Sequence, residues 1–195
     1  MRVPYTADPP TTTDPAELEI VDRIRARRAP RPLQPLDLAL LHSPAVADGW
    51  NSFLGAVRTR TTLSDAVREL AISRVAVCNR AWYEWGHHAP LAVKGGVSPE
   101  AMELVKAEDL GTVTPEQRAA AGLGDAEWAV LRITDEMTRN VAVQDETFAE
   151  ARKHFSEREV VEIVATVSCY NCVSRFLVAL DVGERNATGP DDALH

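Results

Sequence analysis

The sequence predicts an all-α protein of about eight to ten helices, and three observations support this class. Apolar residues recur at three- and four-residue spacing along most of the chain, which is the period of an amphipathic helix. Several of these stretches open with a Ser, Thr or Asp followed by Pro, Glu or Gln, a start signal for helices. No stretch shows sustained alternation of apolar and polar residues, so no strand is expected.

The N-terminal part predicts an arm and three helices. Residues 1–14 are rich in Pro and Thr and are expected to be extended. Asp14 and Pro15 predict the start of the first helix, which the proline-rich segment 30–35 stops. A short helix is predicted around residues 36–41, and Ser43-Pro44 opens another to about residue 57. Its apolar face is expected to comprise Val46, Trp50, Phe53, Leu54 and Val57.

The middle of the chain predicts two consecutive helices with a turn between them. Ser64 or Thr62 caps the first, whose apolar residues recur at helical spacing as far as Cys78. A turn is plausible near residues 79–81, and a second helix runs from Trp82 to about Val93 before Gly95-Gly96 ends it.

The C-terminal half predicts five more helices. They begin at the caps Ser98 and Thr114, at Asp125, and at the caps Asp145 and Ser156; the last is long and apolar and ends near Leu180. We therefore expect an extended arm over residues 1–14, one helical domain over 15–183, and a polar tail over 184–195.

Composition excludes several classes of protein. The chain has 195 residues, a net charge of −8 and a pI near 5.1, which argues against nucleic acid as a partner because phosphate binding needs clustered Lys and Arg. Mean hydropathy is −0.18, and neither a run of about 18 apolar residues nor a signal peptide is apparent, so we expect no membrane span. Three cysteines are too few for a secreted disulfide scaffold, which favours a cytoplasmic location.

The densest group of reactive side chains lies in the segment WYEWGHH, residues 82–88. Glu84 and His88 are four residues apart and share a helix face. Glu69 lies more than about 20 Å from Glu84 along a straight helix, so it joins them only if the chain reverses near residue 80. Two carboxylates and an imidazole in an apolar pocket move each other's pKa values apart, giving an acid and a base at neutral pH. A solvated helix face without function stays open as an alternative.

Aromatic residues beside this group are expected to line the pocket. Trp82, Tyr83 and Trp85 would supply apolar walls and one phenolic donor, although both tryptophans are equally compatible with the core. His87 points about 100° away from His88, so we assign it to the edge of the substrate site or to an interface. A metal site from Glu84, His87 and His88 is disfavoured because consecutive His side chains face different ways.

Several motifs resemble the carboxymuconolactone decarboxylase family. They are Arg-Glu-Leu-Ala-Ile at 68–72, Tyr-Glu-Trp-x-x-His at 83–88, Leu-His-Ser-Pro at 41–44 and Tyr-Asn-Cys-Val-Ser-Arg at 170–175, so the resemblance spans about residues 15–183. It implies the all-α fold of the alkylhydroperoxidase-like proteins and a homo-oligomer, either a trimer or a hexamer.

The peroxidase branch of that superfamily carries Cys-x-x-Cys-x-x-x-His, preceded by a Glu. Those positions match Glu69, Ala81, Glu84 and His88 here. Because both thiols are absent, disulfide-cycling peroxidase chemistry is not expected at this site.

The residues favour a cofactor-independent lyase, such as a decarboxylase, that acts on a small organic acid or lactone. Loss of CO2 would leave a dienolate that protonated Glu84 or His88 reprotonates, while Glu69 orients His88. Arg175 is expected to hold the anionic substrate, unless it pairs with a buried Glu. Tyr83 or Asn171 would donate a hydrogen bond to the enolate oxygen, and Tyr170 is a further candidate for substrate binding. Tyr170 and Asn171 are equally compatible with helix packing.

Two alternatives remain. Cys169 and Cys172 share a helix face and could serve a thiol-dependent peroxidase or disulfide reductase, although they lie deep in a helix, without the help of its N-terminal dipole. The chain could also be a small-molecule-binding protein that kept the fold and lost the activity. A Cys172→Ser variant separates the redox interpretation from proton-transfer chemistry.

Overall fold

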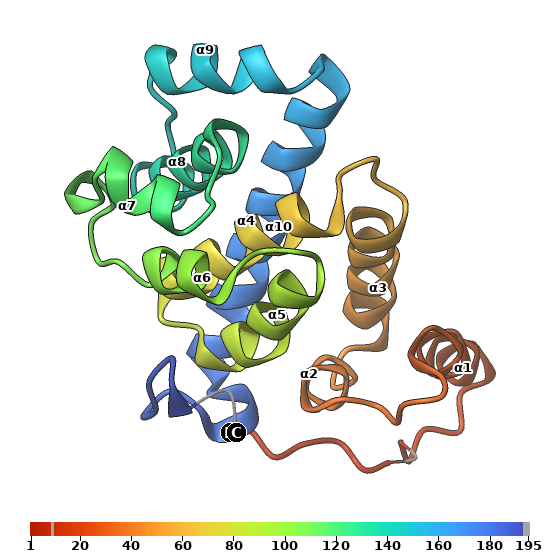
Figure 1. The fold of residues 1–195 in the computed structure, drawn as a ribbon. Helices are drawn as coiled ribbons and strands as arrows, with labels where there is room; N and C mark the ends of the chain where they lie inside the picture. The colour runs from red at the N-terminus through yellow and green to blue at the C-terminus, as the bar shows by residue number, and fades with distance from the viewer. Residues whose placement is uncertain (9, 193–195) are drawn as a thin grey trace.

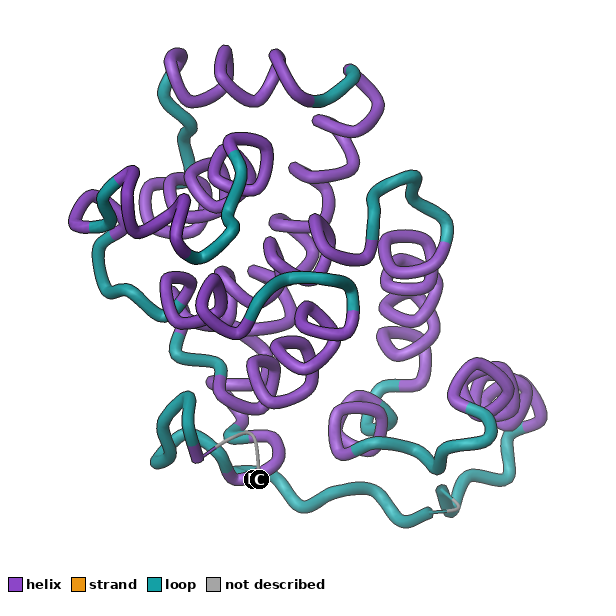
Figure 2. The backbone as a smooth tube through the Cα atoms, viewed as in Figure 1, coloured by secondary structure: helices purple, strands orange, loops and turns teal. Residues whose placement is uncertain are grey.

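The computed structural model describes residues 1–8 and 10–192, and every regular element in this part of the chain is helical (Figures 1 and 2). The all-α prediction is confirmed, with ten α-helices and two 3-10 helices in the described residues. The α-helices are α1 Pro15–Arg28, α2 Pro35–Leu40, α3 Pro44–Thr59, α4 Asp65–Asn79, α5 Trp82–Lys94, α6 Pro99–Val105, α7 Pro115–Ala120, α8 Asp125–Asn140, α9 Asp145–His154 and α10 Glu157–Leu180; the 3-10 helices are η1 Leu110–Thr112 and η2 Val182–Glu184.

Most of the expected helix caps form. The capping side chains accept a hydrogen bond from a backbone N–H in the first turn at Asp14, Ser64, Ser98, Thr114 and Ser156. One cap differs from the prediction: Gln144 precedes α9, and Asp145 is its first helical residue. Local hydrogen bonding therefore sets most helix boundaries in this chain.

The turn between α4 and α5 positions the candidate site. Arg80 ends α4 in the left-handed conformation, with φ of 53°, and the backbone N–H of Ala81 donates to the carbonyl of Ala76 at 2.8 Å. Such a conformation costs a non-glycine residue about 1 kcal/mol. The two helices are in extensive contact, and this reversal carries His88 of α5 back to Glu69 of α4.

Helix α4 forms the centre of the core. Every residue from Glu69 to Ala76 is buried. Val67, Ala71, Ile72 and Val75 pack into one apolar cluster with α1, α2, α3 and α10, whereas Leu70 and Ala76 pack into a second cluster with α5 and α6. Polar residues placed between Glu69 and Ala76 are therefore shielded from water.

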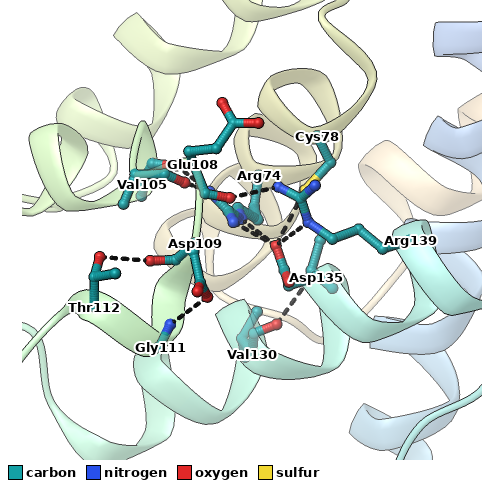
Figure 3. A network of polar contacts seen from close by, with 12 residues as sticks. Arg74, Cys78, Val105, Glu108, Asp109, Gly111, Thr112, Val130, Asp135 and Arg139 are labelled. Carbon is teal, nitrogen blue, oxygen red and sulfur yellow. Dashed lines mark hydrogen bonds and ion pairs between the residues drawn. The ribbon is translucent and has the colours of Figure 1, made fainter.

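A buried ion-pair network ties α8 and the segment after α6 to α4 (Figure 3). The guanidinium of Arg74 is fully buried; its Nε donates to Asp135 at 2.9 Å and its Nη1 donates to the carbonyl of Val105 at 2.7 Å. Arg139 and the thiol of Cys78 also donate to Asp135, at 3.0 and 3.3 Å. This network is structural, because Arg74 already has its charge partner.

Helix α10 corrects one expectation. An 18-residue window of this helix has a mean hydropathy of 1.6, so the chain does contain a segment long and apolar enough to cross a membrane. The core helix of a soluble protein meets the same criterion, and α10 packs against α3, α4, α8 and α9 here. The candidate span is weak evidence for a membrane.

Two other features qualify the predictions for the N-terminal part. On α3 the expected apolar face is rotated: Val46 and Phe53 are 52% and 50% exposed, whereas Ala47 and Asn51 are buried.

The arm runs beside the end of α10, where the Met1 ammonium pairs with Glu184 at 2.5 Å. Residue 9 of the predicted arm and residues 193–195 of the predicted tail lie outside the described residues.

Candidate active site

A narrow pocket of about 70 Å³ lies where α5 and α10 meet the N-terminal helices. Its walls come from α1 to α3, α5, α10 and the segment between α1 and α2. The lining residues are Arg28, Arg31, Gln34, Leu36, Leu54, Arg58, Tyr83, Glu84, His87, His88, Leu91, Tyr170, Val173 and Leu177.

His88 and Glu69 form a buried pair behind the pocket wall. Nδ1 of His88 lies 2.5 Å from Oε2 of Glu69. Burial lowers the pKa of His88 and outweighs the nearby carboxylate, so the imidazole is neutral at pH 7. Because Nδ1–H donates to the carboxylate, Nε2 keeps its lone pair and is the basic atom.

Glu69 itself stays ionised. Burial opposes the charged carboxylate, but the hydrogen bond from His88 and the positive charges of Arg58 and Arg68 outweigh it and hold the pKa of Glu69 below its usual value. Nε of Arg68 lies 3.5 Å from Oε1 of Glu69. A fixed carboxylate on Nδ1 sets both the tautomer and the orientation of the imidazole ring.

Glu84 is in the opposite state. Its side chain is 2% exposed, and the Ser174 hydroxyl lies 3.0 and 3.1 Å from its two oxygens. Burial raises the pKa of Glu84 well above its usual value, and the Ser174 hydrogen bond offsets this only in part. Burial therefore favours the protonated carboxyl, which can donate a proton, whereas neutral His88 in the same pocket can accept one.

Two phenols also line the pocket. Tyr170 is buried with its ring edge-on to His88, at a centroid distance of 5.0 Å; burial raises its pKa, so it is a neutral donor. Tyr83 stacks on His87 at 4.4 Å, and burial raises the pKa of Tyr83 to about 12. His87, predicted at the edge of the site, lines the pocket with its Nδ1 2.8 Å from the Tyr83 carbonyl.

The structure places four predicted substrate-binding residues away from this pocket. Trp85 is buried in the α5–α6 cluster, where its indole N–H donates to the Pro190 carbonyl at 2.9 Å, and Trp82 packs against the same cluster. Arg175 is exposed and donates to the Asn171 carbonyl at 2.9 Å. The Asn171 amide donates to Thr138 at 3.0 Å. These residues serve packing and helix–helix hydrogen bonding.

The cysteines also lie apart from the pocket. Cys169 is buried and Cys172 exposed, in a groove between α3 and α10. Burial raises the pKa of Cys169 to about 12, so it is not an activated thiolate. Within the described residues, no group of three or more His, Cys, Asp or Glu is arranged to hold a metal ion.

The sequence reasoning missed two residues of the site. Ser174, which holds Glu84, lies one helical turn after Tyr170, so helical spacing could have identified it. Arg58 carried no local signal, because α3 brings it to the pocket only through tertiary packing.

Comparisons with known proteins bear on both fold and site. The model of the carboxymuconolactone decarboxylase family matches residues 44–136, the region that contains Arg58, Glu69, Glu84 and His88. No curated protein matches the chain.

Solved structures extend the likeness over nearly the whole chain. An uncharacterized peroxidase-related protein from Silicibacter sp. TM1040 is 17% identical, with a TM-score of 0.70 and coverage of 95% of both chains. An uncharacterized peroxidase-related protein from Ralstonia eutropha JMP134, described as an alkylhydroperoxidase AhpD core, is 15% identical, with a TM-score of 0.70 and coverage of 99% of this chain and 94% of its own. A variant of the debrominase Bmp8 in complex with 2,3,4-tribromopyrrole is 15% identical, with a TM-score of 0.66 and coverage of 92% of this chain and 90% of its own.

At these identities the structural neighbours establish the fold alone. The family match covers α3 to most of α8 and excludes α10, so the resemblance noted for residues 170–175 lies outside the matched region. Residues 44–136 match the model of the carboxymuconolactone decarboxylase family, and the chain has the all-α fold of the AhpD-like proteins.

Proposed function

We propose that this pocket catalyses cofactor-independent proton transfer on a small organic acid or lactone, in a lyase reaction of the decarboxylase type. The observation that carries the proposal is the burial of two groups in one pocket, each with a different partner. Glu84 is held by Ser174, and burial raises its pKa and favours the acid; His88 is held by Glu69, and burial lowers its pKa and favours the neutral base.

In such a reaction the carbon–carboxyl bond of the substrate breaks, CO2 leaves, and the electron pair passes into a dienolate. The Glu84 carboxyl then gives its proton to the carbanionic carbon and is reprotonated from water. Tyr170, which lines the same pocket, would donate a hydrogen bond to the enolate oxygen. In an isomerisation or lactone opening, His88 would instead remove the first proton through Nε2.

The test is turnover of a panel of small lactone and β-keto carboxylates in D2O, followed by CO2 release and by deuterium incorporation at carbon. Wild type is expected to release CO2 and to give a deuterated product. Glu84→Gln should abolish both while the fold stays intact, because Gln keeps a hydrogen bond to Ser174 but has no acidic proton. Arg175→Gln, outside the pocket, is the matched control and should be fully active.

The same panel separates the alternatives. Unimpaired turnover by Glu84→Gln would refute the assignment of the acid. Saturable binding of these compounds without turnover by wild type would favour the non-catalytic interpretation. Reduction of organic peroxides that Cys172→Ser abolishes would favour the thiol-dependent one.

The proposal includes assembly into a trimer or hexamer in the cytoplasm. Val46, Phe53 and Val161 are large apolar side chains exposed on α3 and α10, and such residues are commonly covered by a second subunit. Light scattering coupled to size exclusion tests the assembly, and a monomer at micromolar concentration would contradict it.

A further inference from the structure

The side chains that line the pocket carry more positive than negative charge. Three guanidinium groups line it, from Arg28, Arg31 and Arg58. Arg28 is neutralised by the buried carboxylate of Asp37, 2.8 Å away. The only carboxyl among the lining residues belongs to Glu84, whose neutral form is favoured by burial.

Arg58 is a half-buried pocket cation that has no partner among the described residues. It is half-buried near the end of α3, and no hydrogen bond or ion pair joins its guanidinium to any described residue. Arg31, by contrast, is exposed to water. The chain has 29 acidic residues and a net charge of −8. Carboxylates are therefore plentiful, yet none of the described ones pairs with Arg58.

A half-buried guanidinium loses hydrogen bonds to water, and the charge of nearby Glu69 does not replace them because no described residue accepts a hydrogen bond from Arg58. Its planar fork of five N–H donors matches a carboxylate in two parallel hydrogen bonds. The group that satisfies Arg58 is therefore expected to arrive with the ligand.

We propose that Arg58 binds the carboxylate of the substrate and so selects anionic over neutral ligands. This inference rests on the proposed function, and it assigns to Arg58 the role that the sequence suggested for Arg175. A carboxylate held by Arg58 would leave the remainder of a small ligand in the same pocket as Glu84, His88 and Tyr170.

The test compares a small carboxylate with its neutral isostere. Crotonate and crotonamide have nearly the same shape, and their binding to the full chain is followed by NMR titration at low ionic strength. Wild type is expected to bind crotonate saturably and at least about tenfold more tightly than crotonamide, as charge-assisted hydrogen bonds predict.

Three variants locate the anchor. Arg58→Gln should lose at least about tenfold in crotonate affinity, with crotonamide unaffected. Arg58→Lys, which keeps the charge but not the fork, should fall between Arg58→Gln and wild type. Arg175→Gln should bind both compounds as wild type does.

A second readout follows from the charge that Arg58 exerts on its neighbours. Among the influences on His88, burial and Arg58 lower its pKa whereas Glu69 raises it. The His88 resonance in Arg58→Gln should therefore titrate at a higher pH than in wild type, and Arg175→Gln should leave it unchanged. A change in mere stability would not move this titration.

Equal crotonate affinity in wild type and Arg58→Gln, or equal affinity of wild type for crotonate and crotonamide, would overturn the proposal. So would the absence of saturable crotonate binding to wild type. If Arg58→Gln does not fold, the proposal is tested by the crotonate affinity of Arg58→Lys and by the ratio of the crotonate and crotonamide affinities of wild type. Failure of the proton-transfer assay with this selectivity intact would leave Arg58 as an anion anchor and refute only the proposed chemistry.

Discussion

The protonated state of Glu84 makes a prediction that needs no substrate: wild type should lose stability relative to Glu84→Gln as the pH rises. In the unfolded chain Glu84 ionises near its ordinary pKa of 4.5, whereas burial raises its pKa well above that value in the folded protein. Below pH 4.5 both states hold the proton. Above pH 4.5 only the folded state keeps the proton on Glu84, so a rising pH favours the unfolded state, in which Glu84 is ionised.

The magnitude follows from linkage. Each pH unit between 4.5 and the pKa of the buried carboxyl shifts the folding equilibrium of wild type about tenfold towards unfolding. From about pH 5.5 to about pH 7.5 this amounts to as much as about a hundredfold, or about 3 kcal/mol in the free energy of unfolding. The variant has no such proton, so the difference isolates Glu84.

Urea unfolding of both proteins at several pH values measures this difference. Glu159→Gln is the matched control: hydrogen bonds from Ser156 lower the pKa of Glu159, so it is ionised in both states above about pH 5.5 and its variant should show a constant offset. A pH-independent difference between wild type and Glu84→Gln would mean that Glu84 is ionised in the fold, and would refute the reasoning.

Three further predictions concern activity and the buried network. Turnover should require neutral His88 and protonated Glu84. Burial lowers the pKa of His88 and raises that of Glu84, so the rate should fall on acidification only below about pH 6.5, and on the alkaline side as Glu84 loses its proton. A pH–rate profile measures both limits. Cys172→Ser should leave turnover unchanged, and a large loss would move the chemistry to α10. Asp135→Asn should destabilise the fold by about 3 kcal/mol in urea because it leaves the buried Arg74 charge without its partner; a change below about 1 kcal/mol would show that the network contributes little.

The part of the site that was predictable depends on local structure. Caps and the turn at Arg80 are encoded within a few residues, and together they fix how α5 returns along α4. The approach of Glu69 to His88 follows from that reversal.

The errors arise from helical geometry and tertiary packing. On α10, Arg175 lies about 140° around the helix from Tyr170, whereas Ser174 lies only about 40° from it. Arg175 has the charge expected of a substrate anchor, but its direction around the helix takes it away from the pocket. Trp85 follows Glu84 by one residue, about 100° away, and packs into a different cluster. Arg58 enters the pocket from a separate helix, so no spacing within the sequence relates it to the site.

The account depends most directly on the protonation state of His88 in the resting protein. Nitrogen-15 NMR of histidine-labelled protein at about pH 7 reports both ring nitrogens, and His88→Gln assigns the signals. We predict a neutral imidazole with the proton on Nδ1 and an unprotonated Nε2. An imidazolium, or a proton on Nε2 alone, would contradict the proposal that His88 is a base paired with the acid Glu84.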